Sequence, residues 1–153
     1  MRVSIRPFED GDEPAVVGVW HRSGLAAYTY LPTWQAFTLD EAARVFRNVI
    51  RAQCALWVGT EDEHVVAYLA MKDAYIDRLY VDPSGWRHGW GTRLVNFAKS
   101  LCPTGLTLHT HQDNHAARRF YEKHGFTVVR LGVSPPPESA PDVEYHWMPK
   151  AHA

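Results

Sequence analysis

The residues whose types and spacing most clearly indicate a binding function lie between Leu79 and Leu94, in the stretch LYVDPSGWRHGWGTRL. An apolar strand there leads through a turn into Gly89-Trp90-Gly91-Thr92, which opens a helix. The free N–H groups and positive dipole of a helix N-terminus bind anionic phosphate groups well. Glycine lets the backbone reach positive φ and lets a ligand approach closely, and successive N–H groups can form an anion nest. The pattern predicts a phosphate-binding turn.

Basic side chains surround this turn. Arg87, His88 and Arg93 could add charge-assisted contacts to a pyrophosphate. The same residues also suit an ordinary strand–helix connection whose basic side chains are solvated. A Rossmann site is disfavoured because no acidic residue ends a following strand at the expected distance, and a P-loop is excluded because the Gly-Lys-Ser/Thr ending is missing.

The elements that must position these residues follow from hydrophobic periodicity. The predicted order is β-α-α-β-β-β-α-β-α-β-β, a mixed α/β single domain over residues 1–153. The predicted strands are Val3–Arg6, Ala55–Gly59, Val65–Lys72, Tyr75–Val81, Leu106–Thr110, Phe126–Leu131 and a last one with Val143, Tyr145 and Trp147.

Four helices are predicted from caps and apolar faces. The first two begin at the capping-box pairs Asp10–Glu13 and Thr38–Glu41, and the second buries Ala42, Phe46, Val49 and Ile50. The third has the face Leu94, Phe97, Ala98 and Leu101. The fourth has the face Ala117, Phe120, Tyr121 and His124, with Gly125 after its end. We expect a loop over Ser134–Pro141.

Composition excludes several classes of protein. With 46% hydrophobic and 22% charged residues and a net charge of −1, the chain is typical of a soluble domain and not of a nucleic-acid or anionic-membrane binder. No signal peptide or membrane-spanning run is visible, so we expect a cytoplasmic protein. Cys54 and Cys102 form no disulfide framework or zinc motif and are interpreted as free thiols.

The phosphate-binding stretch resembles the acetyl-CoA-binding motif of GNAT N-acetyltransferases. In that family a strand reading L-Y-V-x-P leads into Q/R-x-x-G-x-G/A at a helix start. Here Leu79-Tyr80-Val81-Asp82-Pro83 is followed by Trp86-Arg87-His88-Gly89-Trp90-Gly91 without a gap. Trp86 departs from the usual Gln or Arg, although that position commonly acts through its backbone.

A second segment strengthens the resemblance. The family pattern N-x-x-A-x-x-F/L-Y-x-x-x-G-F is matched by Asn114, Ala117, Phe120, Tyr121, Gly125 and Phe126. The resemblance covers nearly the whole chain. It implies a central, mostly antiparallel sheet with a splayed parallel strand pair and about four flanking helices. It also implies acetyl-CoA as cosubstrate, an amine acceptor and a donor site of Leu79, Tyr80, Val81, Trp86, Arg87, His88, Gly89, Trp90, Gly91, Thr92, Asn114 and Tyr121.

Acetyl transfer to an amine needs a neutral amine, a stabilised carbonyl oxygen and a protonated leaving thiolate. Tyr121 is the predicted acid, since its phenol is a donor at neutral pH and the matching family residue lies near the CoA sulfur. A core aromatic packed beside Phe120 is the competing interpretation. Asn114 suits both ligand contact and a helix N-cap. The resemblance lets the pantetheine arm pair with the backbone of Leu79 and Val81, while an N–H of Leu79 or Tyr80 polarises the thioester.

The general base is less well determined. Asp77 is the first hypothesis, because a period of two puts it on the face of Leu79 and Val81. A plain carboxylate paired with Arg78 or Arg47 is the alternative, and His109 and His111 are further base candidates. A metal cluster of His109, His111 and His115 is disfavoured, so no metal is expected.

The acceptor pocket is expected near the first two helices, with an aromatic wall of Trp20, Tyr28, Tyr30, Trp34 and Phe37. The leading hypothesis is direct transfer of acetyl to a primary amine of a small molecule or peptide, with no acyl-enzyme. The alternatives are a non-catalytic CoA-binding sensor or interaction module and a nucleotide-binding protein. The acceptor is not identified, and the resemblance leaves open a homodimer formed by strand edges.

Overall fold

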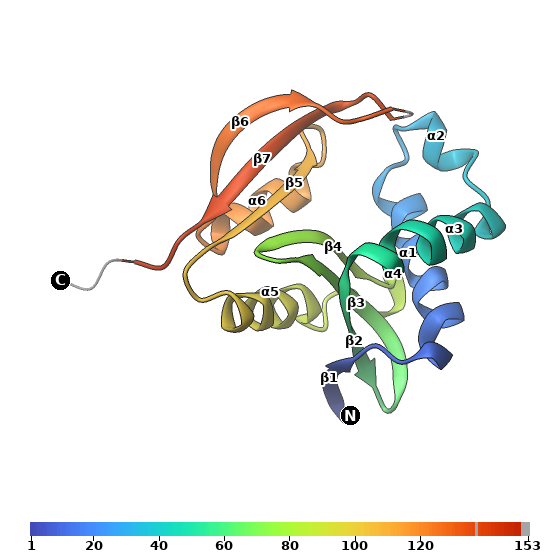
Figure 1. The fold of residues 1–153 in the computed structure, drawn as a ribbon. Coiled ribbons are helices and arrows are strands. Elements are labelled where there is room, and N and C mark those ends of the chain that lie inside the picture. The colour runs from blue at the N-terminus through green and yellow to red at the C-terminus, as the bar shows by residue number, and fades with distance from the viewer. Residues whose placement is uncertain (137, 151–153) are drawn as a thin grey trace.

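The computed structural model describes residues 1–136 and 138–150 and is built on a seven-stranded sheet with the order β1-β2-β3-β4-β5-β7-β6 (Figure 1). Neighbouring strands are antiparallel except for β4 and β5, which are parallel. The strands are β1 Val3–Pro7, β2 Ala55–Glu61, β3 His64–Lys72, β4 Tyr75–Val81, β5 Leu106–His111, β6 Thr127–Val133 and β7 Pro141–Trp147.

Helices cover the two faces of this sheet. Figure 1 shows α5 and α6 on one face and the group from α1 to α4 on the other. The helices are α1 Glu13–Ala27, α2 Pro32–Gln35, α3 Leu39–Val45, α4 Arg51–Gln53, α5 Trp90–Leu101 and α6 His115–Lys123. The mostly antiparallel, mixed α/β architecture with one parallel pair confirms the predicted fold class and the predicted order of its longer elements.

The parallel pair is short. β4 and β5 are joined only at Tyr75–Thr107 and Ile76–Leu108. Beyond those positions the two strands separate while β3 stays paired with β4 as far as Val81. The outer edge of β4 is therefore left without a strand partner along most of its length, which opens the middle of the sheet.

Two hydrophobic cores fix the layers. One packs α5 and α6 against the sheet through residues such as Leu94, Val95 and Tyr145, and Trp90 is buried within it. The other packs α1 and the following helices against the opposite face through residues such as Val16, Phe46 and Tyr68. Each core removes a continuous apolar surface from water, which holds the sheet rigid on both sides of the opening.

Local differences from the predicted elements have physical causes. The first capping box joins Glu9 and Asp12, not Asp10 and Glu13, because a 3₁₀ turn over Asp10–Asp12 precedes α1. The second predicted helix is divided by a π turn over Phe46–Ile50, which shifts the helical face and leaves Val49 exposed. Thr38 caps α3 as predicted, by accepting from the Glu41 N–H at 3.1 Å.

Other helices and strands also differ from the prediction. The short helix α2 was not predicted, and Leu101 at the end of α5 is exposed instead of buried. Strand β7 begins at Pro141, which was expected to be loop, and β6 begins and ends later than predicted. Apart from α2, these differences concern element ends, where backbone pairing to neighbours and not local sequence sets the limit.

Candidate active site

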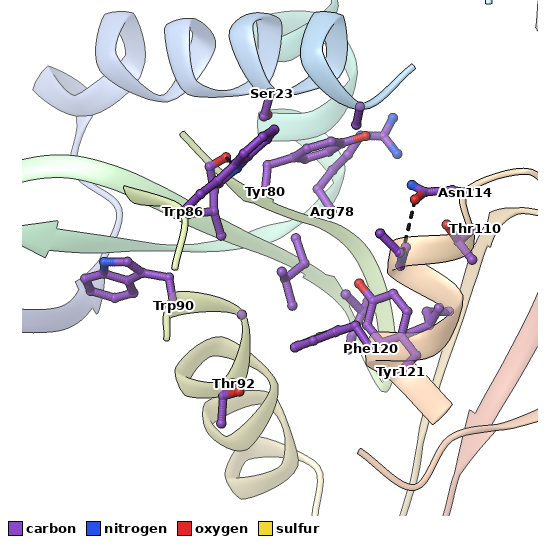
Figure 2. A pocket seen from close by; sticks show the side chains of 18 of the residues that line it. Ser23, Arg78, Tyr80, Trp86, Trp90, Thr92, Thr110, Asn114, Phe120 and Tyr121 are labelled. Atoms are coloured by element: carbon purple, nitrogen blue, oxygen red, sulfur yellow. Dashed lines mark hydrogen bonds between the residues drawn. The ribbon is translucent and has the colours of Figure 1, made fainter. Parts of the chain in front are cut away.

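A cavity of about 590 Å³ lies at the opening beside β4 (Figure 2). Its walls come from α1, β4, the turn before α5, the start of α5, β5 and α6. The predicted donor-site residues that border it are Leu79, Tyr80, Val81, Trp86, Arg87, Gly89, Trp90, Gly91, Thr92, Asn114 and Tyr121, and Asp77 borders it as well. Segments as distant in sequence as Ser23 and Tyr121 thus meet at one cavity. His88 is not among the lining residues.

The turn before α5 presents backbone donors to this cavity. Gly89 is the N-cap of α5 and has φ +79°, a conformation that glycine adopts without strain. The first bond within the helix runs from the Arg93 N–H to the Gly89 carbonyl at 3.1 Å. The N–H groups of Trp90, Gly91 and Thr92 therefore precede the helical ladder, and they supply a positive helix end suited to an anion.

The two glycines have different roles. A Cβ built on Gly89 would meet no atom within 4 Å, so this position leaves room for a ligand. A Cβ on Gly91 would lie 2.9 Å from the Phe120 ring, so this glycine lets α5 and α6 approach each other. The predicted use of glycine for close approach thus applies to ligand space at Gly89 and to helix packing at Gly91.

Two predicted donor residues direct their side chains elsewhere. The Trp90 indole is buried against Gly59 and donates from Nε1 to Glu61 Oε2 at 2.7 Å. His88 Nδ1 is bonded to the same Glu61 oxygen at 2.8 Å. Glu61 therefore ties the turn to the end of β2. In Figure 2 the Trp90 ring points away from Tyr121 and Phe120, so Trp90 borders the cavity mainly from the helix start.

Trp86 and Arg87 form the outer part of the turn. Trp86 is 47% exposed, and its Nε1 donates to the Val81 carbonyl at 3.0 Å. Arg87 has φ +68°, which is uncommon for a residue with a Cβ. Residues in such strained backbone conformations are often found at active sites and ligand-binding sites.

Asn114 and Tyr121 approach the cavity from α6. The Asn114 side chain accepts from the Ala117 N–H at 3.1 Å, which confirms the predicted N-cap (Figure 2). Tyr121 is 9% exposed and packs against Phe120 and Phe126 with ring centroids 5.2 and 5.5 Å away. Figure 2 shows its hydroxyl directed towards the cavity. Burial raises the pKa of the Tyr121 phenol, so the hydroxyl keeps its proton at neutral pH.

Asp77 does not lie where a regular strand would put it. The register of β3 with β4 passes from Ala70–Arg78 to Met71–Ile76, so Asp77 is the extra residue of a bulge. Its Oδ2 accepts from Cys54 Sγ at 3.6 Å, and Lys72 and Arg78 lie 3.7 and 3.6 Å away. The expectation that Asp77 shares a face with Leu79 and Val81 is wrong, because the bulge breaks the alternation. Arg78 is its partner as expected, whereas Arg47 pairs with Glu13.

A second cavity of about 630 Å³ lies on the other side of β4, next to α1 and α2. It is bordered by an aromatic group of Trp20, Tyr28 and Trp34 and by the carboxylates of Asp77, Glu138 and Asp142. Tyr30 and Phe37, which were expected in this wall, are not among its lining residues. The residues that border both cavities are Tyr28, Asp77, Arg78, Tyr80, His109 and Thr110. The two cavities therefore meet where β4 and β5 separate.

Several lining residues were not predicted. Ser23 and Ala27 reach the first cavity from α1, and Ser134 and Glu138 reach the second from the β6–β7 loop. Glu138 Oε2 lies 2.7 Å from His111 Nε2. No motif marks these positions, because tertiary packing alone brings them to the opening.

The described residues contain no group of three or more His, Cys, Asp or Glu side chains arranged to hold a metal ion. Across residues 1–136 and 138–150, none of the helices has the length and apolar character required to cross a bilayer.

Comparison with known proteins agrees with this geometry. Residues 22–126 match the model of the acetyltransferase (GNAT) family. The chain is 32% identical over 132 residues to the peptidyl-lysine N-acetyltransferase YjaB of Escherichia coli K12, covering 84% of this chain and 85% of that protein. The solution structure of apo-form YjaB from Escherichia coli has a TM-score of 0.81 at 26% identity, covering 96% of this chain and 98% of that one.

A more distant structure contains the expected cosubstrate. YncA from Salmonella typhimurium, a putative acetyltransferase solved with its cofactor acetyl-CoA, has a TM-score of 0.67 at 16% identity, covering 99% of this chain and 96% of that one. At this identity the likeness concerns the fold. The family match over most of the chain, together with the YjaB relatives, shows that the chain belongs to the GNAT family and is an N-acetyltransferase of that type.

Proposed function

We propose that this protein transfers acetyl from acetyl-CoA directly to a primary amine, and that the amine is a lysine side chain of a peptide or protein. The observation that carries the proposal is the meeting of two cavities at the separated strands. One cavity has a backbone anion site and the Tyr121 hydroxyl, and the other has an aromatic and acidic lining. A donor and an acceptor held in these cavities would meet near residues that border both, such as Tyr80 and Thr110.

The first cavity suits acetyl-CoA. The donors at Trp90, Gly91 and Thr92 would bind the diphosphate, and Arg87 would add charge. The outer edge of β4 offers unpaired backbone groups to the amides of the pantetheine arm, in the manner of an added strand. Tyr121, which borders the same cavity, would protonate the departing thiolate.

The second cavity suits a cation. Aromatic faces and carboxylates both attract an ammonium group, and Trp34 and Asp142 provide them here. The relative YjaB is named a peptidyl-lysine N-acetyltransferase, which supports lysine as the amine. This cavity lies between α2 and the β6–β7 loop and is not enclosed on all sides. A lysine side chain could enter it while the rest of the peptide stays outside.

The positions of the two cysteines agree with direct transfer of the acetyl group. Neither Cys54 nor Cys102 borders either cavity. Burial raises the pKa of Cys54 to about 11, which disfavours the nucleophilic thiolate at neutral pH. An acyl-enzyme on cysteine is therefore not part of the proposal.

The test is acetylation of lysine-containing peptides, followed by thiol release and by mass spectrometry of the peptide. Tyr121→Phe should lower kcat by about 10² to 10³, because a general acid contributes that much, and should leave CoA affinity nearly unchanged. Tyr30→Phe, a hydroxyl deletion outside both cavities, is the matched control. Tight CoA binding without turnover on any amine would instead support a non-catalytic sensor. Equal turnover by wild type and Tyr121→Phe would remove Tyr121 from the acid role.

A further inference from the structure

A row of three polar side chains crosses β4, β5 and β7 beside the second cavity, where β4 and β5 are still paired. Tyr75 on β4 and His109 on β5 are joined by a 2.8 Å hydrogen bond between the tyrosine hydroxyl and His109 Nδ1. The other ring nitrogen, His109 Nε2, lies 3.4 Å from Glu144 Oε1 on β7. Tyr75 borders the second cavity and His109 borders both. The row therefore runs from the wall of the second cavity to Glu144 on β7, which borders neither cavity.

Glu144 orients the imidazole. Its carboxylate accepts from His146 Nε2 at 2.7 Å, and Arg130 Nη1 lies 3.8 Å away. The hydrogen bond from His146 lowers the pKa of Glu144, so the carboxylate is ionised at neutral pH. A carboxylate facing Nε2 favours the His109 tautomer with its proton on Nε2, which leaves the Nδ1 lone pair to accept from Tyr75.

Tyr75 can act as a proton relay between the cavity and His109. Burial raises the pKa of the Tyr75 phenol to about 12, so the phenol holds its proton at neutral pH. It donates that proton to His109 Nδ1, and its oxygen lone pairs can accept a further proton from a group in the cavity. This arrangement passes a proton without a stable phenolate.

We propose that Tyr75 and His109 form the path by which the acceptor ammonium loses its proton before acetyl transfer. The inference rests on the proposed function. An ammonium N–H proton passes to the Tyr75 oxygen while the Tyr75 proton passes to His109 Nδ1. The product is a neutral amine and an imidazolium next to the Glu144 carboxylate. The imidazolium then releases one proton to water, since its side chain is 40% exposed.

In the remaining steps, the protons are balanced through the Tyr121 hydroxyl. The amine nitrogen forms a bond to the thioester carbon, and the C–S bond breaks. The thiolate takes the proton of Tyr121, and the second N–H proton of the adduct returns to the Tyr121 oxygen. The products are an amide and a free thiol, with one proton released overall through His109.

Asp77 is less suited to this task than the sequence indicated. Its carboxylate lies among Cys54, Lys72 and Arg78, so two cations and a thiol already surround it. His109 instead has Nδ1 bonded to the hydroxyl of Tyr75, which borders the second cavity, and Nε2 facing Glu144, which borders neither cavity. This is the arrangement by which a positioned carboxylate supports a general base.

The test compares two peptides that differ only in the pKa of their amine. One carries lysine, and the other carries a lysine analogue whose amine pKa is lowered into the neutral range by fluorine substitution. His109→Gln and Tyr75→Phe should each lower kcat/KM for the lysine peptide by about 10². For the fluorinated peptide, whose amine is already largely neutral, the loss should be below about fivefold. His64→Gln and Tyr30→Phe are matched controls outside both cavities, and calorimetric CoA binding should stay unchanged in all four variants.

Two outcomes overturn the proposal. One is an equal loss on both peptides in His109→Gln and Tyr75→Phe with CoA binding intact, since a structural role does not depend on amine pKa. The other is a pKa-dependent loss in Asp77→Asn that is absent from the His109 and Tyr75 variants. Failure of the proposed function would be seen separately, as wild-type protein that binds CoA and acetylates neither peptide.

Discussion

The Trp86 indole and the Val81 carbonyl are joined by a 3.0 Å hydrogen bond at the unpaired edge of β4. The next N–H, that of Asp82, bonds to Val66 on β3 at 2.7 Å. Because the two ends of a peptide unit point in opposite directions, the Val81 carbonyl faces away from β3 and towards the opening. The Trp86 indole therefore already uses the Val81 carbonyl. This carbonyl lies on the edge of β4 that is proposed to pair with pantetheine.

Trp86→Phe should increase CoA affinity. The phenylalanine ring keeps apolar cover over the turn but cannot donate, so the Val81 carbonyl becomes free for the ligand. One neutral hydrogen bond contributes about 1 kcal/mol, which corresponds to a roughly fivefold lower Kd in calorimetry with CoA. Trp86→Ala separates the loss of the ring from the loss of the bond. If Trp86→Phe binds CoA no tighter than wild type, the Val81 carbonyl is not a ligand group.

Gly89→Ala should weaken CoA binding and reduce stability. An L-residue at φ +79° costs about 1 to 2 kcal/mol, so we expect the melting temperature to fall by about 2 to 8 °C. The new methyl group would also project into the free space where the diphosphate is proposed to lie, so the Kd of CoA should rise about tenfold or more.

Gly11→Ala is the matched control, because a Cβ there also meets nothing within 4 Å and the backbone has no positive φ. A Gly89→Ala protein that binds CoA as tightly as the Gly11→Ala protein would contradict a ligand site at this turn.

Most residues that the sequence assigned to the donor site border one cavity, because they lie in local units of the chain. The residues from Leu79 to Thr92 form a strand, a turn and a helix start, and Asn114 and Tyr121 lie seven positions apart on one helix. Apolar periodicity and capping residues specify such units directly. The residues of the second cavity come from α1, α2, β4, β5 and the segment from β6 to β7, which no local pattern relates.

The main errors in the site have one kind of cause. The bulge at Asp77 depends on the register between β3 and β4, and a period-two pattern within β4 cannot show it. The side chains of His88 and Trp90 turn towards Glu61, which lies 27 and 29 positions earlier in the chain. Interactions between distant segments therefore decided where these three side chains point.

Asp12 should make stability depend on pH in the acid range. Its carboxylate accepts from Arg6 Nη1 and Nη2 at 2.8 and 2.9 Å, and from the Glu9 N–H at 2.8 Å. The hydrogen bonds from Arg6 are the main cause that lowers the pKa of Asp12 in the folded protein. The resulting stabilisation is complete above the unfolded pKa of about 3.9. It is lost as the pH falls below that value and through the lower folded pKa.

Asp12→Asn should therefore cost about 1.5 to 3 kcal/mol of unfolding free energy at pH 7, the contribution of hydrogen bonds to a charged group. This difference from wild type should shrink as the pH is lowered below about 4, because wild-type Asp12 also becomes neutral. Urea unfolding at a series of pH values measures it. Asp62→Asn, at an exposed turn where the carboxylate accepts from the Arg2 N–H, is the control and should cost little at any pH. A difference between Asp12→Asn and wild type that stays constant from pH 7 to pH 3 would show that shape, and not charge, is what Asp12 contributes at the start of α1.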